Sequence, residues 1–166
     1  MFRPFAKWLS MTPLSVWFQS HAWVVPISQS IHIVCVCLLF TSALTINVRL
    51  LRHRAGGRSL SDLTGTLLPV MWWCLAGLAF TGVLQTITEP VRQFVTPMFW
   101  AKMLMIVIVA IMTLAFAGKV RANAPRWDDT SQRPKGARAF AIVTSLLWIS
   151  IVICGRFIGY TWSFYT

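Results

Sequence analysis

Three basic or ionisable side chains fall in stretches of the chain that are otherwise apolar: His32, Lys102 and Arg156. Such a group is costly inside a membrane unless it is paired, faces water or binds a ligand. Lys102 lies five residues after Pro97, and Arg156 lies eighteen residues after Arg138. At a rise of about 1.5 Å per helical residue, these spacings place all three side chains in the same half of the bilayer. We therefore expect them to converge on one site.

The chemistry of this site is set by its excess of positive charge. Glu89 is the only carboxylate in the neighbouring sequence. Two cations and a histidine facing one acid are suited to an anionic guest, such as the propionates of haem b, a bound lipid phosphate or a carboxylate. A quinone is another candidate for the site. The alternative without a guest is that Lys102 and Arg156 extend to the headgroups while His32 bonds a neighbouring helix.

Haem b would need a second axial ligand beside His32, which is the candidate metal ligand. His53 lies at the opposite membrane face, about 30 Å away along a helix. The second ligand would therefore be His21, a methionine such as Met98, or a residue of a second subunit. Copper is a further candidate, because thioethers bind Cu(I) and three methionines lie near Lys102: Met98, Met103 and Met105. These three do not share one helix face, which argues against a copper site. No catalytic triad, carboxylate pair or phosphate loop is present, so an enzyme is not favoured.

The elements that must position these residues are four long apolar stretches, approximately 27–51, 63–87, 98–118 and 140–155. Each approaches or exceeds the roughly 20 residues that a helix needs to cross a bilayer. The composition agrees, with 57% hydrophobic and 11% charged residues. The sequence thus predicts an all-α polytopic membrane protein with four antiparallel transmembrane helices in residues 27–166.

Residues 1–26 precede this domain and are predicted to lie on the outer membrane surface. The segment 12–25 has apolar residues at helical spacing, with Thr12-Pro13 as a start signal and Pro26 as the end of a short amphipathic helix. No cleavable signal peptide is expected. All four cysteines fall within the predicted spans, which favours apolar packing over a disulfide framework.

Positive charge is concentrated in the first and third loops and at their edges, as the positive-inside rule requires of cytoplasmic loops. These residues are Arg49, Arg52, Arg54, Arg58, Lys119, Arg121, Arg126, Arg133, Lys135 and Arg138. Both termini are then outside, in the periplasm of a Gram-negative cell. The net charge of +11 therefore reflects membrane topology and contact with lipids, and nucleic-acid binding is not expected.

The order of motifs resembles a bacterial four-helix inner-membrane family of unknown function. The motifs are Ser20 to Pro26 leading to His32, Arg49-Leu50-Leu51, Arg58-Ser59-Leu60-Ser61, Thr81-Gly82, Phe99-Trp100-Ala101-Lys102-Met103, Ser145 with Trp148, and Gly155-Arg156-Phe157-Ile158. The resemblance implies the bacterial inner membrane but no activity. A more distant architectural likeness is to haem-b membrane cytochromes and copper-resistance D-type proteins.

Three functional interpretations follow. In the first, the protein is a membrane subunit that holds haem b or a quinone at His32, Lys102, Arg156 and His21 for electron transfer near the periplasm. In the second, it is a cofactor-free accessory or scaffold subunit of a larger complex. In the third, it is a small transporter or ligand-binding protein. The small-residue spacing Gly155-x-x-x-Gly159 also predicts a homo-oligomer or a subunit of a larger assembly.

Overall fold

Helices make up all the regular structure in the part of the chain that the computed structural model describes, which is residues 3–52, 58–129, 131, 133–134 and 136–161. Four of them are long and apolar enough to cross a membrane: α3 (Val24–Leu51), α4 (Leu60–Thr88), α6 (Pro97–Ala122) and α8 (Gly136–Thr161). The predicted all-α fold with four membrane-spanning helices is confirmed.

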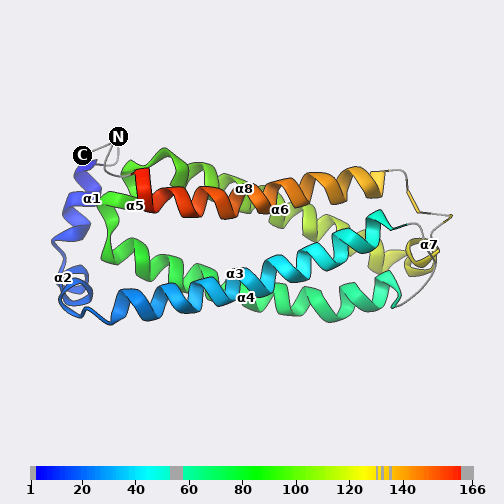
Figure 1. The fold of residues 1–166 in the computed structure, drawn as a ribbon, viewed down its shortest axis with the longest axis horizontal. Coiled ribbons are helices and arrows are strands. Elements are labelled where there is room, and N and C mark those ends of the chain that lie inside the picture. The colour runs from blue at the N-terminus through cyan, green and yellow to red at the C-terminus, as the bar shows by residue number, and fades with distance from the viewer. Residues whose placement is uncertain (1–2, 53–57, 130, 132, 135, 162–166) are drawn as a thin grey trace.

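The four spans run antiparallel in chain order and form an elongated bundle (Figure 1). Helix α3 packs most extensively along α4, α6 packs along α8, and α3 also packs against α8. Contact between α4 and α6 is much sparser. The bundle is therefore built from two helical hairpins, α3–α4 and α6–α8, joined mainly through α3 and α8.

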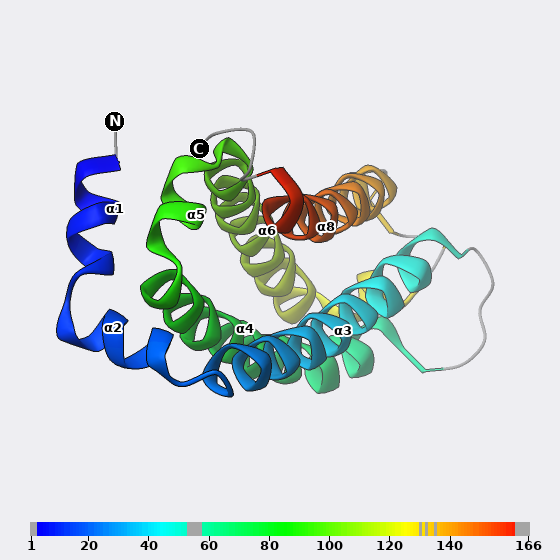
Figure 2. The ribbon, with the colours of Figure 1, turned by 60° about the vertical axis from the view of Figure 1, so that its left-hand side comes forward.

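Short helices lie at both ends of the bundle. Helices α1 (Arg3–Ser10), α2 (Pro13–Ser20) and α5 (Pro90–Val95) gather where α8 ends, which we call the terminal end (Figures 1 and 2). Helix α7 (Ala124–Asp128) lies at the opposite end, which we call the basic end. The sequence predicted a surface helix in this N-terminal region, but α1, α5 and α7 were missed because helices of five to eight residues complete too few turns to establish a helical repeat.

Helix α2 shows why the N-terminal segment folds where it does. The Thr12 hydroxyl accepts a hydrogen bond from the Ser15 amide at 3.4 Å, and Pro13 occupies the first helical turn, where a missing N–H costs nothing. The Ser15 hydroxyl is buried and donates to the carbonyl of Ile87 at 2.7 Å. This bond ties α2 to the end of α4.

Two predicted boundaries need correction. Pro26 does not end the surface helix: α2 ends at Ser20, and Pro26 lies in the first turn of α3, where its missing N–H has no intrahelical acceptor. Helix α8 begins four residues before the predicted span and continues to Thr161, six residues past its predicted end at residue 155. Gly155 and Arg156 are therefore interior positions of a helix.

The hydrophobic core fills the bundle from the basic end to about its middle. Its buried residues nearest the terminal end are Leu39 on α3 and Cys74 on α4. On the other hairpin they are Val109 of α6 and Ile151 of α8. Towards the terminal end, the inward positions include polar side chains that are only half-buried, among them His32 and Lys102. The interior thus changes from apolar to polar along the bundle.

Candidate functional site

His32 faces the interior of the bundle from α3. It precedes the buried residues Leu39, Ser42 and Ile46 on the same helix face, as the helical spacing predicted. Its Nδ1 atom lies 2.7 Å from the hydroxyl oxygen of Thr81 on α4. His53, which the sequence placed on this face, lies outside the described residues.

The hydrogen bonds of Thr81 select one tautomer of His32. The Thr81 hydroxyl donates to the carbonyl of Gly77, one turn earlier, at 2.8 Å. A hydroxyl has a single hydrogen, so the 2.7 Å contact with His32 requires Nδ1–H of the imidazole to be the donor. In a neutral ring, the lone pair is then on Nε2. His32 consequently offers a hydrogen-bond acceptor or a ligand atom to whatever approaches Nε2.

Lys102 reaches the same interior from α6. Its side chain is half-buried, and Lys102 lies five residues into α6 whereas His32 lies eight residues into α3, so the two residues are at similar depth. The ammonium nitrogen lies 3.6 Å from the position that a Cβ atom on Gly155 would occupy. Lys102 makes no hydrogen bond or ion pair within the part of the chain that the structure describes. Gly155 therefore leaves room for an ammonium group that has no protein partner there.

All four spans contribute to this place, which we call the His32–Lys102 site and define by His32, Thr81, Lys102 and Gly155. His32 lies eight residues after the start of α3, and Lys102 lies five residues after the start of α6. Thr81 lies seven residues before the end of α4, and Gly155 lies six residues before the end of α8. At helical rise, each is about 8 to 12 Å from the terminal end of its helix. The four positions therefore share one depth.

Gln85 adds an unpaired donor on the α4 side of the bundle. It lies one turn beyond Thr81 towards the terminal end, and its Nε2 atom is buried without a hydrogen-bond partner in the described structure. A buried amide left unpaired costs on the order of 1–3 kcal/mol. This residue was not predicted from the sequence, although its position four residues after Thr81 was a usable signal.

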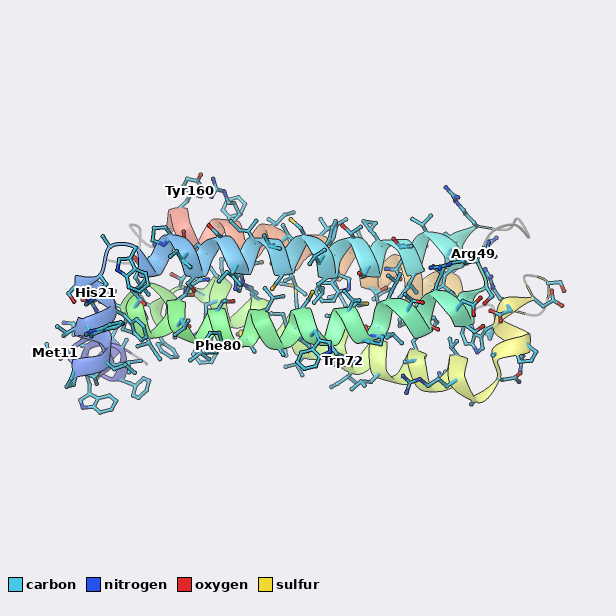
Figure 3. All side chains as sticks on the ribbon, turned by 90° about the horizontal axis from the view of Figure 1, so that it is seen from below. Met11, His21, Arg49, Trp72, Phe80 and Tyr160 are labelled. Carbon is cyan, nitrogen blue, oxygen red and sulfur yellow. The ribbon has the colours of Figure 1, made fainter. Side chains whose placement is uncertain are left out.

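Arg156 does not join the site, and the expected convergence of all three groups is wrong for this residue. Its side chain is exposed, its Nη2 donates to the hydroxyl of Tyr160 at 2.6 Å, and its guanidinium lies 4.9 Å from the centre of the Tyr160 ring. Figure 3 shows Tyr160 projecting away from the bundle. Glu89 is also engaged elsewhere, because it forms an ion pair with Arg92.

His21 lies at the surface of the terminal end rather than at the His32–Lys102 site (Figure 3). Its ring packs 4.3 Å from the Trp17 ring, and its Nδ1 lies 2.8 Å from the Trp17 carbonyl. Met98 and Met103 are placed outward as well, 39% and 43% exposed, whereas Met105 is half-buried and packs against the hydrophobic core. No group of three or more His, Cys, Asp or Glu side chains suited to a metal ion occurs among the described residues.

A second polar cluster, which the sequence did not indicate, lies at the basic end. Asp128 of α7 accepts hydrogen bonds from the Ser61 amide at 2.9 Å and the Ser61 hydroxyl at 2.6 Å. Burial acts to raise the pKa of Asp128, but these bonds, a further one from the Leu60 amide and the nearby charge of Arg133 lower it below its usual value. The carboxylate thus binds the first turn of α4, where a helix favours negative charge.

The profile of DUF6644, a family of unknown function, matches residues 19–161. The chain belongs to this family. The matched region contains all four spans and each residue of the His32–Lys102 site, whereas α1 lies outside it. No curated protein and no solved structure matches the chain. The family membership confirms the sequence resemblance to a family of unknown function, and the four apolar helices make this a membrane protein.

Proposed function

We propose that this membrane protein binds a quinone-class redox cofactor at the His32–Lys102 site and serves as a subunit for electron transfer. The observation that carries the proposal is the pairing of an acceptor and a donor across the two hairpins. His32 offers the Nε2 lone pair from α3, and Lys102 offers an ammonium group with no protein partner in the described structure from α6. A quinol hydroxyl would donate to His32, and a quinone carbonyl would accept from Lys102.

The packing of the helices supports a lipid-soluble guest. The apolar core stops short of this depth, and α4 contacts α6 sparsely compared with the contact that each makes within its own hairpin. A ligand dissolved in the bilayer could therefore approach between the hairpins without crossing a packed core. The bound cofactor would supply two-electron chemistry, and the neutral His32 ring would orient it through a hydrogen bond.

Haem b fits the described residues less well than a quinone does. Bis-histidine ligation needs two inward histidines at similar depth, but His21 packs on Trp17 at the surface. A second axial ligand for haem would therefore have to be a methionine or a residue of a second subunit. Visible spectra of the oxidised and dithionite-reduced protein distinguish these two cofactors, because only haem gives a strong Soret band.

We further propose that the basic end faces the cytoplasm of a bacterial cell, with the site in the periplasmic leaflet. The proposal is supported by the positive-inside rule, because the basic loops and the α6–α7 connection all lie at this end of the bundle. Self-association or assembly into a larger complex is also proposed. Gly159 is exposed, and a Cβ atom placed on it would meet no other atom within 4 Å, so a neighbouring helix can approach there.

The test is cofactor occupancy in protein purified in mild detergent, with bound quinone extracted and measured by chromatography and mass spectrometry. His32→Ala and Lys102→Met should each lower the quinone-to-protein ratio severalfold. Arg156→Gln is the matched control, because it removes a cation that lies next to Gly155 in the chain but points away from the site. Equal loss of quinone in all three variants, or no quinone in the wild type, would refute the proposal. A Soret band that His32→Ala abolishes would show that the bound cofactor is haem and not a quinone.

A further inference from the structure

A groove of about 470 Å³ runs along α3 towards the basic end. Two ridges of the helix form its floor, Phe40, Leu44 and Val48 with a spacing of four residues, and Thr41 with Thr45 beside them. Each ridge ends one turn further on in an arginine, the first at Arg52 and the second at Arg49. The groove is therefore apolar along its length and basic at one end.

The opposite wall brings a third arginine to the same end. Arg58, two residues before α4, and Leu63, in its first turn, complete the lining. Arg52 and Arg58 are exposed, and neither guanidinium makes a hydrogen bond or ion pair within the described residues. No lining residue is acidic, and Asp62, beside Leu63, is exposed, with its amide donating to the hydroxyl of Ser59, the N-cap residue of α4. Positive charge at this end is thus not neutralised by the groove itself.

The length of the groove matches a molecule with a long apolar part. Phe40 and Arg52 are twelve residues apart on α3, which corresponds to about 18 Å, over half of the roughly 30 Å hydrocarbon thickness. A small anion would require only the arginines at the end. Figure 3 shows Arg49 at the basic end. The end of a membrane-spanning helix is where the headgroups of a bilayer are expected.

We propose that this groove is a binding site for one anionic phospholipid, with an acyl chain along Phe40, Leu44 and Val48 and its phosphate between Arg49, Arg52 and Arg58. Guanidinium groups bind phosphate oxygens through paired hydrogen bonds, and basic pockets at membrane-spanning helices favour anionic headgroups. Leu44 and Phe40 are half-buried, so an acyl chain would cover apolar surface that the protein covers only in part. The site is separate from the His32–Lys102 site, which lies in the other half of the bundle.

Native mass spectrometry of the whole protein in detergent tests the headgroup contact. The probes are phosphatidylglycerol and phosphatidylcholine with identical acyl chains, and we expect phosphatidylglycerol to be retained preferentially. The double variant Arg52→Gln with Arg58→Gln should weaken its binding about fivefold for each arginine and about thirtyfold together. The matched control is Lys119→Gln with Arg121→Gln, which removes two exposed charges from the basic end of α6 outside the groove. An equal loss in the control would overturn the proposal.

The acyl-chain contact is tested separately, without removing charge. Leu44→Trp fills the groove and should lower retention of phosphatidylglycerol, whereas Leu104→Trp, on an exposed face of α6, should not. Unchanged retention in Leu44→Trp would overturn the lipid assignment. Inorganic phosphate at millimolar concentration should not displace the lipid, and displacement would show a small-anion site instead. Gel filtration and circular dichroism of each variant establish that it is folded.

Discussion

Arg133 joins two parts of the chain that are 84 residues apart: its Nη1 donates to the main-chain carbonyl of Arg49 at 2.9 Å. The Nε of the same guanidinium donates to the Trp127 carbonyl at 2.8 Å. The carbonyls at the end of a helix have no intrahelical partner, and a cation there also complements the helix dipole. Arg133 thus closes the end of α3 and ties it to α7.

We predict that Arg133→Met lowers the free energy of unfolding by about 1.5–3 kcal/mol, the usual contribution of a hydrogen bond to a charged group. Methionine retains much of the side-chain volume but donates no hydrogen bonds to Arg49 or Trp127. Unfolding by sodium dodecyl sulfate in mixed micelles, followed by tryptophan fluorescence, gives the measurement. Arg121→Met removes an exposed charge from the basic end and should have little effect. If the two variants had the same free energy of unfolding, the hydrogen bonds of Arg133 would not be a stabilising element.

Asp128 should make the stability of the basic end depend on pH. Its pKa in the folded protein lies below the ordinary value of 3.8, because hydrogen bonds from Ser61 and Leu60 and the charge of Arg133 outweigh the effect of burial. A lowered folded pKa means that the stabilisation is complete well above pH 3.8. It is lost as the pH falls through the ordinary value towards the folded pKa.

Unfolding of the wild type and Asp128→Asn, measured between about pH 6 and pH 3, isolates this contribution. The difference between them should be largest above about pH 5 and shrink at lower pH. Subtraction removes the titration of the other carboxylates, which both proteins share. A difference that stays constant across the range would contradict the assignment to Asp128.

Membrane orientation is a third prediction. Ser131 is exposed near α7, so a cysteine there should react with a membrane-impermeant maleimide only after the cells are opened. Gly57, which lies outside the described residues, provides a second position on the other basic loop. Met11 is 76% exposed between α1 and α2, and Met11→Cys should react in cells permeable only at the outer membrane. The reverse pattern would place the basic end outside.

The helix faces and depths were predictable where a single helix determines them. His32 and the buried residues that follow it on α3 obey the helical repeat, and the depth of Lys102 follows from its distance to Pro97. Arg156 was misplaced because depth does not fix rotation. Gly155 faces Lys102, and successive helical residues point about 100° apart, so Arg156 must point elsewhere.

Contacts between distant parts of the chain could not be predicted from one sequence. Asp128 and Ser61 are 67 residues apart, and nothing in their local patterns indicates that α7 lies against the start of α4. The role of Thr81 as the partner of His32 likewise depends on the rotation of α4 against α3. The periodicity of apolar residues predicts which face of each helix is buried. The register between two helices is set by how their side chains pack in three dimensions.

The last prediction uses Gly155 to test whether the space beside Lys102 holds a ligand. A Cβ at this position would lie 3.6 Å from the Lys102 ammonium nitrogen, which is ordinary contact, so Gly155→Ala should be tolerated. Gly155→Leu places further carbons where the ammonium group lies and should lower quinone occupancy severalfold by displacing Lys102. Gly118→Leu is the matched control, since this glycine of α6 is exposed, lies near the basic end, and has nothing within 4 Å of its side-chain position. Equal occupancy in Gly155→Leu and Gly118→Leu, with both variants folded, would show that Lys102 does not hold the cofactor.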